Sequence, residues 1–477
     1  MATTALSAPI AVPTEAYPPS WGFRQAVVCL FLIAVCFDQA PGRTVPDTKL
    51  DLVVAPWRLL GRALSMWDPQ SAAGVVQNQA GGYLWPTGPF FGVLHSLGLP
   101  AWVVQRGWWS LVVVVAFLGI VRLGRALGAG TEATRLLAGV AFALSPRMFA
   151  SLGPISVEVL PLALSPWVLL PLVDACRGRS VRRSAALSAL AVLCMGGVNA
   201  AATLGGVLPA ALFLLLGPVA VSRLRLAAWW VLAVALATAW WVLPLLLLGR
   251  YAAPFLPYTE TAGVTTSVTS LTEVLRGTSN WVTYLYDTEG PLRPAGWDLL
   301  TSRPLVLASG LVVALGLAGV AMRRAPARAW LVGSLLLGVL LVSAGHAGVF
   351  GSPVSAWVRV ALDGPLAPLR NVHKFDPLVR LPARAWGGAR SGRSAMASGP
   401  DADTRASAAR HRCCLGGRAR RAGSRRSGSH TSWEVVRTGA RGLVGRGSSA
   451  GAGRGIRACS AAALLAVRGV HLGGPCR

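Results

Sequence analysis

The stretch AWVVQRGWWSLVVVVAFLGIV, Ala101 to Val121, decides the class of fold. It is nearly free of charge, and a helix of about 20 mostly apolar residues is long enough to cross the hydrocarbon core of a bilayer. The whole chain has a mean hydropathy of +0.55 and only 13% charged residues, whereas soluble domains carry roughly a quarter. We therefore expect an all-α polytopic membrane protein.

Further segments of the same kind precede residue 381. Nine are expected, at 21–37, 101–121, 134–151, 154–174, 184–202, 204–222, 226–248, 304–322 and 329–350. The first should stay in the mature chain, because residues 1–20 lack a basic start and no small-residue cleavage site precedes Asp38. The eight cysteines show no metal-binding spacing. The predicted organisation is a cytoplasmic segment over 1–20 and a transmembrane domain over 21–380.

Arginine is concentrated in four of the short connections between these segments. The positive-inside rule then places all four on the cytoplasmic side if the N-terminus is cytoplasmic. The residues are Arg122, Arg125 and Arg135; Arg177, Arg179, Arg182 and Arg183; Arg223 and Arg225; and Arg323, Arg324 and Arg328. Three longer loops, 38–100, 250–303 and 351–380, face outward and hold nearly all the acids outside the tail. We expect a multi-pass plasma-membrane protein whose chemistry is extracytoplasmic.

The first outward loop contains an amphipathic pattern, LDLVVAPWRLLGRALSMW. Five apolar residues share one helical face, and Pro56 suits the first turn of such a helix. The pattern predicts a helix lying in the membrane interface. The five are Leu59, Leu60, Ala63, Leu64 and Trp67.

Just before it, VPDTKLDL (Val45 to Leu52) places Asp47 and Asp51 four positions apart around Lys49, one of two lysines in the chain. One interpretation is that both acids lie on one helical face, and a carboxylate there could deprotonate an acceptor hydroxyl. The other is that Asp47 occupies the turn after Pro46 and caps a helix beginning near Thr48, with Asp51 a solvated acid.

The second lysine lies in LRNVHKFDP, which is part of the third outward loop. Arg370 and Lys374 could bind phosphate, and His373 could relay a proton. A loop that merely anchors at lipid head groups is the alternative. Glu260, in PYTETAG, could position an acceptor or be an exposed loop residue.

Two further sets of residues are candidates. QNQAGGYLWPTGPFF (Gln77 to Phe91) includes Asn78 and Gln79, whose amides suit sugar hydroxyls, although the aromatics would equally form an interfacial belt. Glu158, in GPISVEVL, is an ionisable residue inside an apolar segment and is a functional candidate by default. Snorkelling to the interface is the alternative for Glu158.

The last part of the chain, 381–477, differs in character. It holds 18 arginines, no lysine and three acids, without helical or strand periodicity. It could be a disordered basic arm that binds lipid head groups or nucleic acid. Translation out of frame explains it better, because basic arms usually mix in lysine. We therefore expect no nucleic-acid partner, and no nucleotide-binding or zinc-protease motif is present.

Three stretches, DTKLDL, NQAGGYLWPTGPFF and NVHKFDPLVRLP, resemble the actinobacterial α-(1→3)-arabinofuranosyltransferase D family. These are membrane glycosyltransferases of the GT-C class, and the resemblance spans Trp21 to Pro382. It implies a GT-C-like helix bundle, a polyprenyl-phosphate arabinofuranose donor and an acceptor in cell-wall arabinan, either arabinogalactan or lipoarabinomannan. It also implies a first-loop aspartate at the active site, for which we prefer Asp47, with Asp51 as its neighbour or a divalent-cation partner.

The implied reaction is a single displacement with inversion, in which an acceptor hydroxyl attacks the anomeric carbon and lipid phosphate leaves. Lys49, Glu260, Arg370, His373, Lys374, Asn78 and Gln79 are then the expected donor and substrate contacts. Family members are longer, and ARAWGGARSGRSA replaces the apolar helix expected after Pro382, so we expect a truncated product. The alternative function is a transporter or flippase of lipid-linked saccharides, in which Glu158 would be central.

Overall fold

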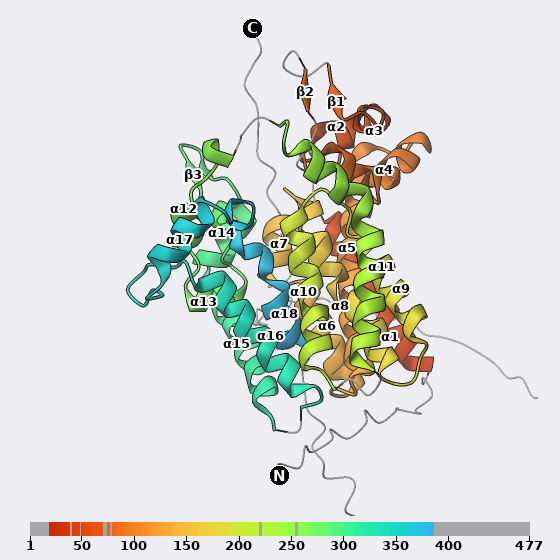
Figure 1. Ribbon diagram of the computed structural model, residues 1–477, viewed down its shortest axis with the longest axis vertical. Helices are drawn as coiled ribbons and strands as arrows, with labels where there is room; N and C mark the ends of the chain where they lie inside the picture. Colours follow the sequence, from red (N-terminus) through yellow and green to blue (C-terminus); the bar gives the residue numbers. More distant parts are fainter. Residues whose placement is uncertain are drawn as a thin grey trace, which may run out of the picture. The chain divides into compact units, whose positions relative to one another are not determined.

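A computed structural model describes residues 19–38, 41–47, 49–69, 74–76, 79–218, 222–252, 256–323 and 325–385. Helices dominate these residues (Figure 1). The only strands among them form two short antiparallel pairs. They are β1 (Trp67–Asp68) with β2 (Val75–Val76), and β3 (Tyr286–Asp287) with β4 (Gly290–Pro291).

Long apolar helices make up the body of the fold, which confirms the all-α membrane class. In the described part of the chain, four helices are long and apolar enough to cross a membrane, where nine crossings were predicted. They are α5 (Ala101–Ala126), α8 (Ser156–Ala175), α11 (Arg223–Leu248) and α15 (Arg303–Ala321). Three further apolar helices occupy three more of the predicted segments. They are α1 (Pro19–Phe37), α10 (Ala200–Leu216) and α16 (Arg328–Ser343).

The third predicted segment, 134–151, is two helices rather than one. Two residues separate the end of α6 (Glu132–Ala143) from the start of α7 (Pro146–Leu152). Pro146 causes the break, because proline has no N–H to donate and disfavours helical geometry in the residue before it. It instead occupies the first position of α7, where a missing N–H costs nothing. The short α7 brings Arg147 into the protein interior.

The fifth predicted segment, 184–202, is also shorter than expected. α9 (Val181–Leu193) has 13 residues, too few to cross a bilayer. Gly196, with a φ of 75° that favours glycine, lies in the turn between α9 and α10. The prediction of one continuous span here was therefore wrong.

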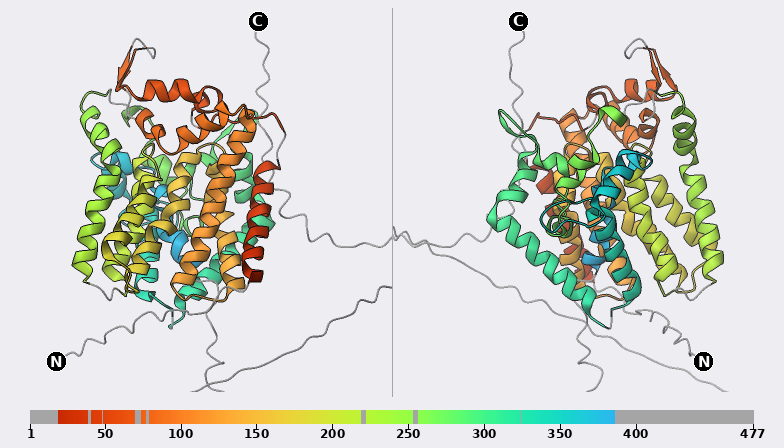
Figure 2. Two further views of the ribbon diagram at one scale, coloured as in Figure 1. Left: turned by 90° about the vertical axis from the view of Figure 1, so that its right-hand side faces the viewer. Right: turned by 60° about the vertical axis from the view of Figure 1, so that its left-hand side comes forward.

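α8 is at the centre of the helical packing. It contacts α5, α9 and α10, while α5 also packs on α1 and α6, and α11 packs on α9 (Figure 2). Phe117, Val168, Leu169 and Phe213 are fully buried in the resulting core. Because α8 is surrounded in this way, side chains from several segments can reach its first turn.

The first loop covers one end of these helices (Figure 2). Its elements are α2 (Leu50–Val54), α3 (Pro56–Ala63), η1 (Ala80–Leu84) and α4 (Thr87–Ser96). α3 packs on η1 and α4, and Leu59, Leu60 and Ala63 are buried there, whereas Leu64 and Trp67 are exposed. The apolar face predicted for an interfacial helix is thus largely covered by the protein itself.

The second and third loops are mostly short helices. They include η2 (Leu256–Tyr258), α12 (Ala262–Ser267), α13 (Leu271–Arg276), η3 (Trp281–Tyr284), α14 (Pro294–Thr301), α17 (Ser355–Asp363), η4 (Ala367–Leu369) and η5 (Val372–Phe375). α18 (Pro377–Ala385) follows and packs on α16, α10, α15 and α6. The boundary predicted at residue 380 falls inside α18, where Arg380 and Leu381 are fully buried.

The connections α5–α6, α8–α9 and α15–α16 lie at the end of the helices opposite to the first loop (Figure 2). The described arginines of three of the four clusters lie in these connections or in the helix turns that flank them. The clusters predicted to share one side of the membrane therefore share one end of the fold. Which side of the membrane this end faces stays a prediction.

Candidate active site at the first turn of α8

Asp47, the predicted base, lies buried against the first turn of α8. Its Oδ1 accepts the N–H of Ser156 at 2.6 Å, which is one of the amides that a helix N-terminus leaves without an intrahelical partner. Its φ of 41° lies in the left-handed region, which aspartate tolerates better than most residues. Asp47 thus caps α8, and not the helix beginning near Thr48. The N-cap of α2 is Lys49, which makes no side-chain cap.

Burial sets the protonation behaviour of Asp47. It raises the pKa of this carboxyl from 3.8 to about 6, because the charged form loses its hydration. Hydrogen bonding to Ser156 lowers the pKa of Asp47 and offsets part of the rise caused by burial. The nearby indole of Trp109 also lowers the pKa, although its N–H makes no hydrogen bond to that carboxyl by the distance and angle criteria. Oδ2 is buried and has no hydrogen-bond partner within the described residues. A carboxyl with a pKa near neutrality suits general-base chemistry.

Asp51 has different surroundings. Its carboxylate is about half exposed and forms an ion pair with Arg62, whose guanidinium also lies 3.9 Å from Asp68. Asp47 precedes α2, whereas Asp51 lies in its first turn. The interpretation that Asp47 and Asp51 share one helical face was therefore wrong.

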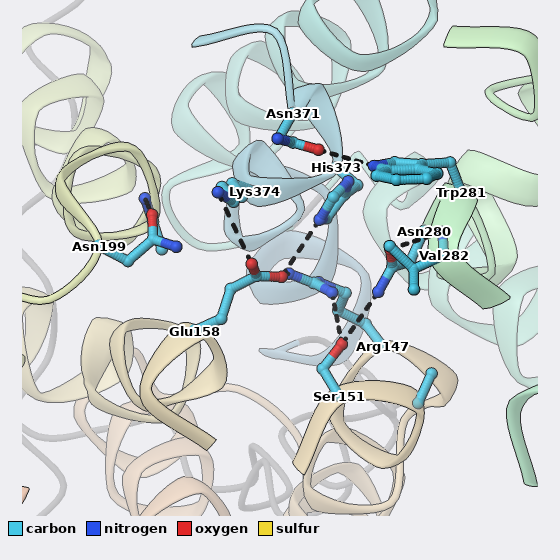
Figure 3. Close-up of polar contacts among 12 residues, drawn as sticks. Arg147, Ser151, Glu158, Asn199, Asn280, Trp281, Val282, Asn371, His373 and Lys374 are labelled. Atoms are coloured by element: carbon cyan, nitrogen blue, oxygen red, sulfur yellow. Dashed lines mark hydrogen bonds and ion pairs between the residues drawn. The ribbon is translucent and has the colours of Figure 1, made fainter. Parts of the chain in front are cut away.

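Glu158 is the centre of a buried ionic cluster that also lies at the first turn of α8 (Figure 3). Its Oε1 is 2.5 Å from Nη2 of Arg147, from α7, and 3.1 Å from Nε2 of His373, from η5. Nζ of Lys374 lies 3.7 Å from its Oε2. The fold thus places His373 and Lys374, two of the predicted donor contacts, around an acid that the sequence marked only as an intramembrane ionisable residue.

His373 is neutral at physiological pH. Burial, reinforced by the positive charge of Arg147, lowers its pKa from 6.5 to about 4, and the attraction of Glu158 does not compensate. The neutral ring then donates through Nε2 to Glu158, which makes Nδ1 an acceptor. This Nδ1 is buried with no hydrogen-bond partner in the described part of the chain.

The charges of the cluster do not balance. Arg147 and Lys374 are two cations that face the single carboxylate of Glu158. Arg293 adds a third nearby, and burial lowers its pKa to about 10, which still leaves it protonated at pH 7. An excess of buried positive charge favours an anionic ligand.

Ser151 and the side-chain amide of Asn280 extend this cluster. Nδ2 of Asn280 donates to Oγ of Ser151 at 3.1 Å, and Nη1 of Arg147 donates to the same oxygen at 2.8 Å. None of Asn280, Ser151 and Arg147 was among the residues predicted from the sequence. Arg147 could have been found from the sequence, because an arginine inside a segment predicted to cross the membrane is a candidate functional residue.

Glu260 joins the same region through Asn371. Its Oε1 accepts from Nδ2 of Asn371 at 2.6 Å, while Oδ1 of Asn371 accepts from the Trp281 indole at 2.7 Å. Asn371 immediately precedes η5. An indole, an amide and a carboxylate are therefore joined by hydrogen bonds at the start of η5, the element that carries His373.

The remaining predicted contacts are not part of these groups. Arg370 is buried, and its guanidinium contacts Asp363, the Leu256 carbonyl and Thr259, so it holds loops together. Lys49 and Gln79 are exposed. Asn78 lies outside the described residues.

The divalent cation proposed from the sequence has no cluster to hold it in the described residues. There, no three His, Cys, Asp or Glu side chains are arranged to bind a metal ion. Asp47 and Asp51, the pair suggested for a cation, have separate partners.

Comparison with known proteins agrees with the resemblance seen in the sequence. The model for the N-terminal GT-C domain of alpha-(1→3)-arabinofuranosyltransferase matches residues 31–416. The chain is 48% identical over 357 residues to an alpha-(1→3)-arabinofuranosyltransferase of Mycolicibacterium smegmatis, and 48% identical over 359 residues to one of Mycobacterium tuberculosis. Each alignment covers 75% of this chain and 25% of the relative, so the chain spans about a quarter of their length.

Similarity also extends to solved structures. The cryo-EM structure of arabinofuranosyltransferase AftD from Mycobacteria matches with a TM-score of 0.62 and 40% identity, covering 79% of this chain and 24% of that one. A structure of a variant of that enzyme matches with a TM-score of 0.58. Because the family model covers most of the sequence, the chain belongs to the alpha-(1→3)-arabinofuranosyltransferase family, in its N-terminal GT-C domain.

Proposed function

We propose that this chain carries the active site of an arabinofuranosyltransferase. It would transfer arabinofuranose from a polyprenyl-phosphate donor to cell-wall arabinan, of arabinogalactan or lipoarabinomannan, with inversion. The observation that carries the proposal is the pairing of a buried carboxyl, Asp47, with the excess positive charge around Glu158 at one helix turn. The reaction would occur at the outer face of the plasma membrane, with the N-terminus cytoplasmic.

Asp47 acts as the general base. Its Oδ2 has no competing hydrogen bond in the described residues, and it accepts the proton of the acceptor hydroxyl as that oxygen attacks the anomeric carbon. The bond from the anomeric carbon to the phosphate oxygen breaks, and its electron pair leaves with polyprenyl phosphate. Because attack and departure occur in one step on opposite faces, the anomeric configuration inverts.

The cluster around Glu158 binds the donor phosphate. Arg147 and Lys374 neutralise charge that develops on the leaving phosphate oxygen, where preorganised cations are most effective. His373, neutral at pH 7 because of its lowered pKa, holds Glu158 in place through Nε2. Trp281, Asn371 and Glu260 would contact sugar, since an indole face and polar side chains suit a sugar ring and its hydroxyls.

Transfer by the chain in lipid nanodiscs tests this proposal. The assay supplies synthetic polyprenyl-phosphate arabinofuranose and a short arabinan oligosaccharide. Asp47→Asn should lower the rate by at least 100-fold and leave binding of polyprenyl phosphate within two-fold. Asp51→Asn is the matched control and should keep wild-type transfer, because Asp51 is half exposed and paired with Arg62.

Two results would overturn the proposal. One is wild-type transfer by Asp47→Asn. The other comes from a second assay, with the protein reconstituted into lipid vesicles. If the wild type and Asp47→Asn both move the lipid-linked sugar across the vesicle membrane without transferring it, the protein behaves as a flippase. Retention of configuration in the product would exclude the single displacement.

A further inference from the structure

Two consecutive residues of α5 hold the backbone that leads into Asp47. The side-chain amide of Gln105 bonds to both backbone groups of Val45: Oε1 accepts its N–H at 3.1 Å, and Nε2 donates to its C=O at 2.7 Å. Nη2 of Arg106 donates to the carbonyl of Arg43 at 3.0 Å. These contacts fix the chain two to four residues before the base.

The amide of Gln105 makes the two hydrogen bonds to Val45 that a neighbouring β-strand would otherwise make. Residues 43–46 are in neither helix nor strand, so their N–H and C=O groups need partners from elsewhere when they are buried. The side chain of Gln105 is completely buried, so its amide depends for its hydrogen bonds on the backbone of Val45, which is half-buried, and on Arg106. Leaving a buried amide without a hydrogen-bond partner is costly, because the group loses its contact with water and gains nothing in return.

Asp47 needs support of this kind because its backbone is strained. A non-glycine residue in the left-handed region, here at φ 41°, is strained and persists only where the surroundings enforce it. On the far side, Asp47 is held by its hydrogen bond to Ser156. On the near side, it is held through Val45 by Gln105.

Arg106 joins this support to the surroundings of the carboxyl. Its Nη1 donates to Oε1 of Gln105 at 3.1 Å, which orients the amide. Its guanidinium also stacks on the Trp109 ring, 4.3 Å from the centroid, and Trp109 lies beside Asp47. One turn of α5 therefore contacts both the backbone before Asp47 and the ring next to its carboxyl.

We propose that Gln105, oriented by Arg106, is a positioning residue that sets the place of the Asp47 carboxylate for proton abstraction. The inference rests on the proposed role of Asp47 as base. Gln105 touches no substrate in this scheme. It acts on the rate of the chemical step through the backbone of residues 43–47, and a displacement of about 1 Å in such a group can cost about 100-fold in rate.

Gln105→Met tests the proposal in nanodiscs, because methionine preserves length and removes both hydrogen bonds. We expect kcat to fall about 10- to 100-fold while KM for the polyprenyl-phosphate donor stays within two-fold. Hydrogen exchange at the Val45 amide should rise at least ten-fold. Ser110→Ala is the matched control on the same helix, since its buried hydroxyl donates to the Arg106 carbonyl within α5 and lies beside the Cys36 thiol, with no hydrogen bond to residues 43–47, and it should behave as wild type.

Gln105→Glu provides a second variant if the methionine variant does not fold. It keeps an acceptor for the Val45 N–H and for Arg106, and loses the donor to the Val45 carbonyl. We expect kcat between those of the wild type and Asp47→Asn, again with KM nearly unchanged. Wild-type kcat in a folded Gln105 variant with a freely exchanging Val45 amide would overturn the inference.

A failure of the proposed function would look different. In that case Asp47→Asn would keep wild-type transfer, whatever the Gln105 variants do. If Asp47→Asn is inactive and the Gln105 variants are fully active, the base is correct and the positioning role is wrong. A loss in KM rather than kcat in Gln105→Met would also contradict the positioning role, because it would indicate an effect on donor binding.

Discussion

Asp47 combines two unfavourable features at one residue: a left-handed backbone and a carboxyl shielded from water. Neither helps the chain to fold. Strain and costly burial that persist in a native structure are often found at functional sites. The free energy that stabilises Asp47 comes from its neighbours, chiefly the α8 amide of Ser156 and the Gln105 amide.

Asp47→Asn should therefore make the protein more stable at pH 7 while it removes the base. A carboxyl whose pKa is about 6 when folded and 3.8 when unfolded binds more protons in the folded state between these values. Stability then falls as pH rises through this window, by on the order of 3 kcal/mol in total. Asparagine has no charge to bury and can still accept from Ser156.

Thermal unfolding in nanodiscs at pH 4 and pH 7 checks this. The gain from Asp47→Asn should be present at pH 7 and largely absent at pH 4. An equal gain at both pH values would mean that the buried charge is not the cause.

Glu158→Gln should have the opposite effect on stability. The change leaves Arg147 and Lys374 facing each other without a counter-charge in a buried site, and breaking a buried ion pair typically costs about 3–5 kcal/mol. The midpoint of thermal unfolding should drop markedly. Asp174→Asn is the matched control: its partner Arg179 is 3.7 Å away and largely exposed, so the cost there should stay below about 1 kcal/mol.

At the scale of elements, the contact of α10 with η5 is made possible by a glycine. A Cβ at Gly205 would collide with the backbone carbonyl of Lys374. The segment that carries His373 and Lys374 thus lies directly on the α10 backbone. No side chain intervenes, so the position of η5 depends on this close approach.

Gly205→Ala should displace η5. We expect a loss of about 1–3 kcal/mol in stability and weaker binding of polyprenyl phosphate, measured by unfolding and by equilibrium binding in nanodiscs. Gly310→Ala, in α15, is the matched control, because a Cβ there meets nothing within 4 Å. It should be neutral or stabilising by up to about 1 kcal/mol. Unchanged binding in Gly205→Ala would argue against a role for η5 at the phosphate.

The helix boundaries show which features of the secondary structure could be predicted from the sequence and which could not. Hydropathy located all the long helices, because it is a local property of each segment. It missed the break before Pro146 and the early end of α9 at Leu193. Apolar composition continues across both points, and only backbone geometry interrupts the helices there.

At the scale of the whole molecule, the arginine clusters predict which end faces the cytoplasm. Arg179→Cys, in the α8–α9 connection, should react with a membrane-impermeant thiol reagent only after cells are permeabilised. Asp287→Cys, in the second outward loop, should react in intact cells, with the wild-type chain as background. The reverse pattern would contradict the predicted orientation.

The sequence by itself determined the membrane class, the approximate place of most apolar helices and the family, since these depend on composition and on short stretches read in order. It also singled out Asp47, His373 and Lys374. The pattern of VPDTKLDL could not tell which acid is buried, because a shared helical face and a cap at Asp47 both fit it, and the preference for Asp47 came from the family resemblance.

Tertiary structure alone decided how the site is assembled. Glu158 and His373 are 215 positions apart, and Arg147 reaches them only because Pro146 starts a short helix there. The carboxyl of Asp47 is set by contacts to Ser156 and, through Val45, to Gln105. Desolvation and hydrogen-bond geometry depend on which segments pack together in space, and no local pattern in the sequence specifies that.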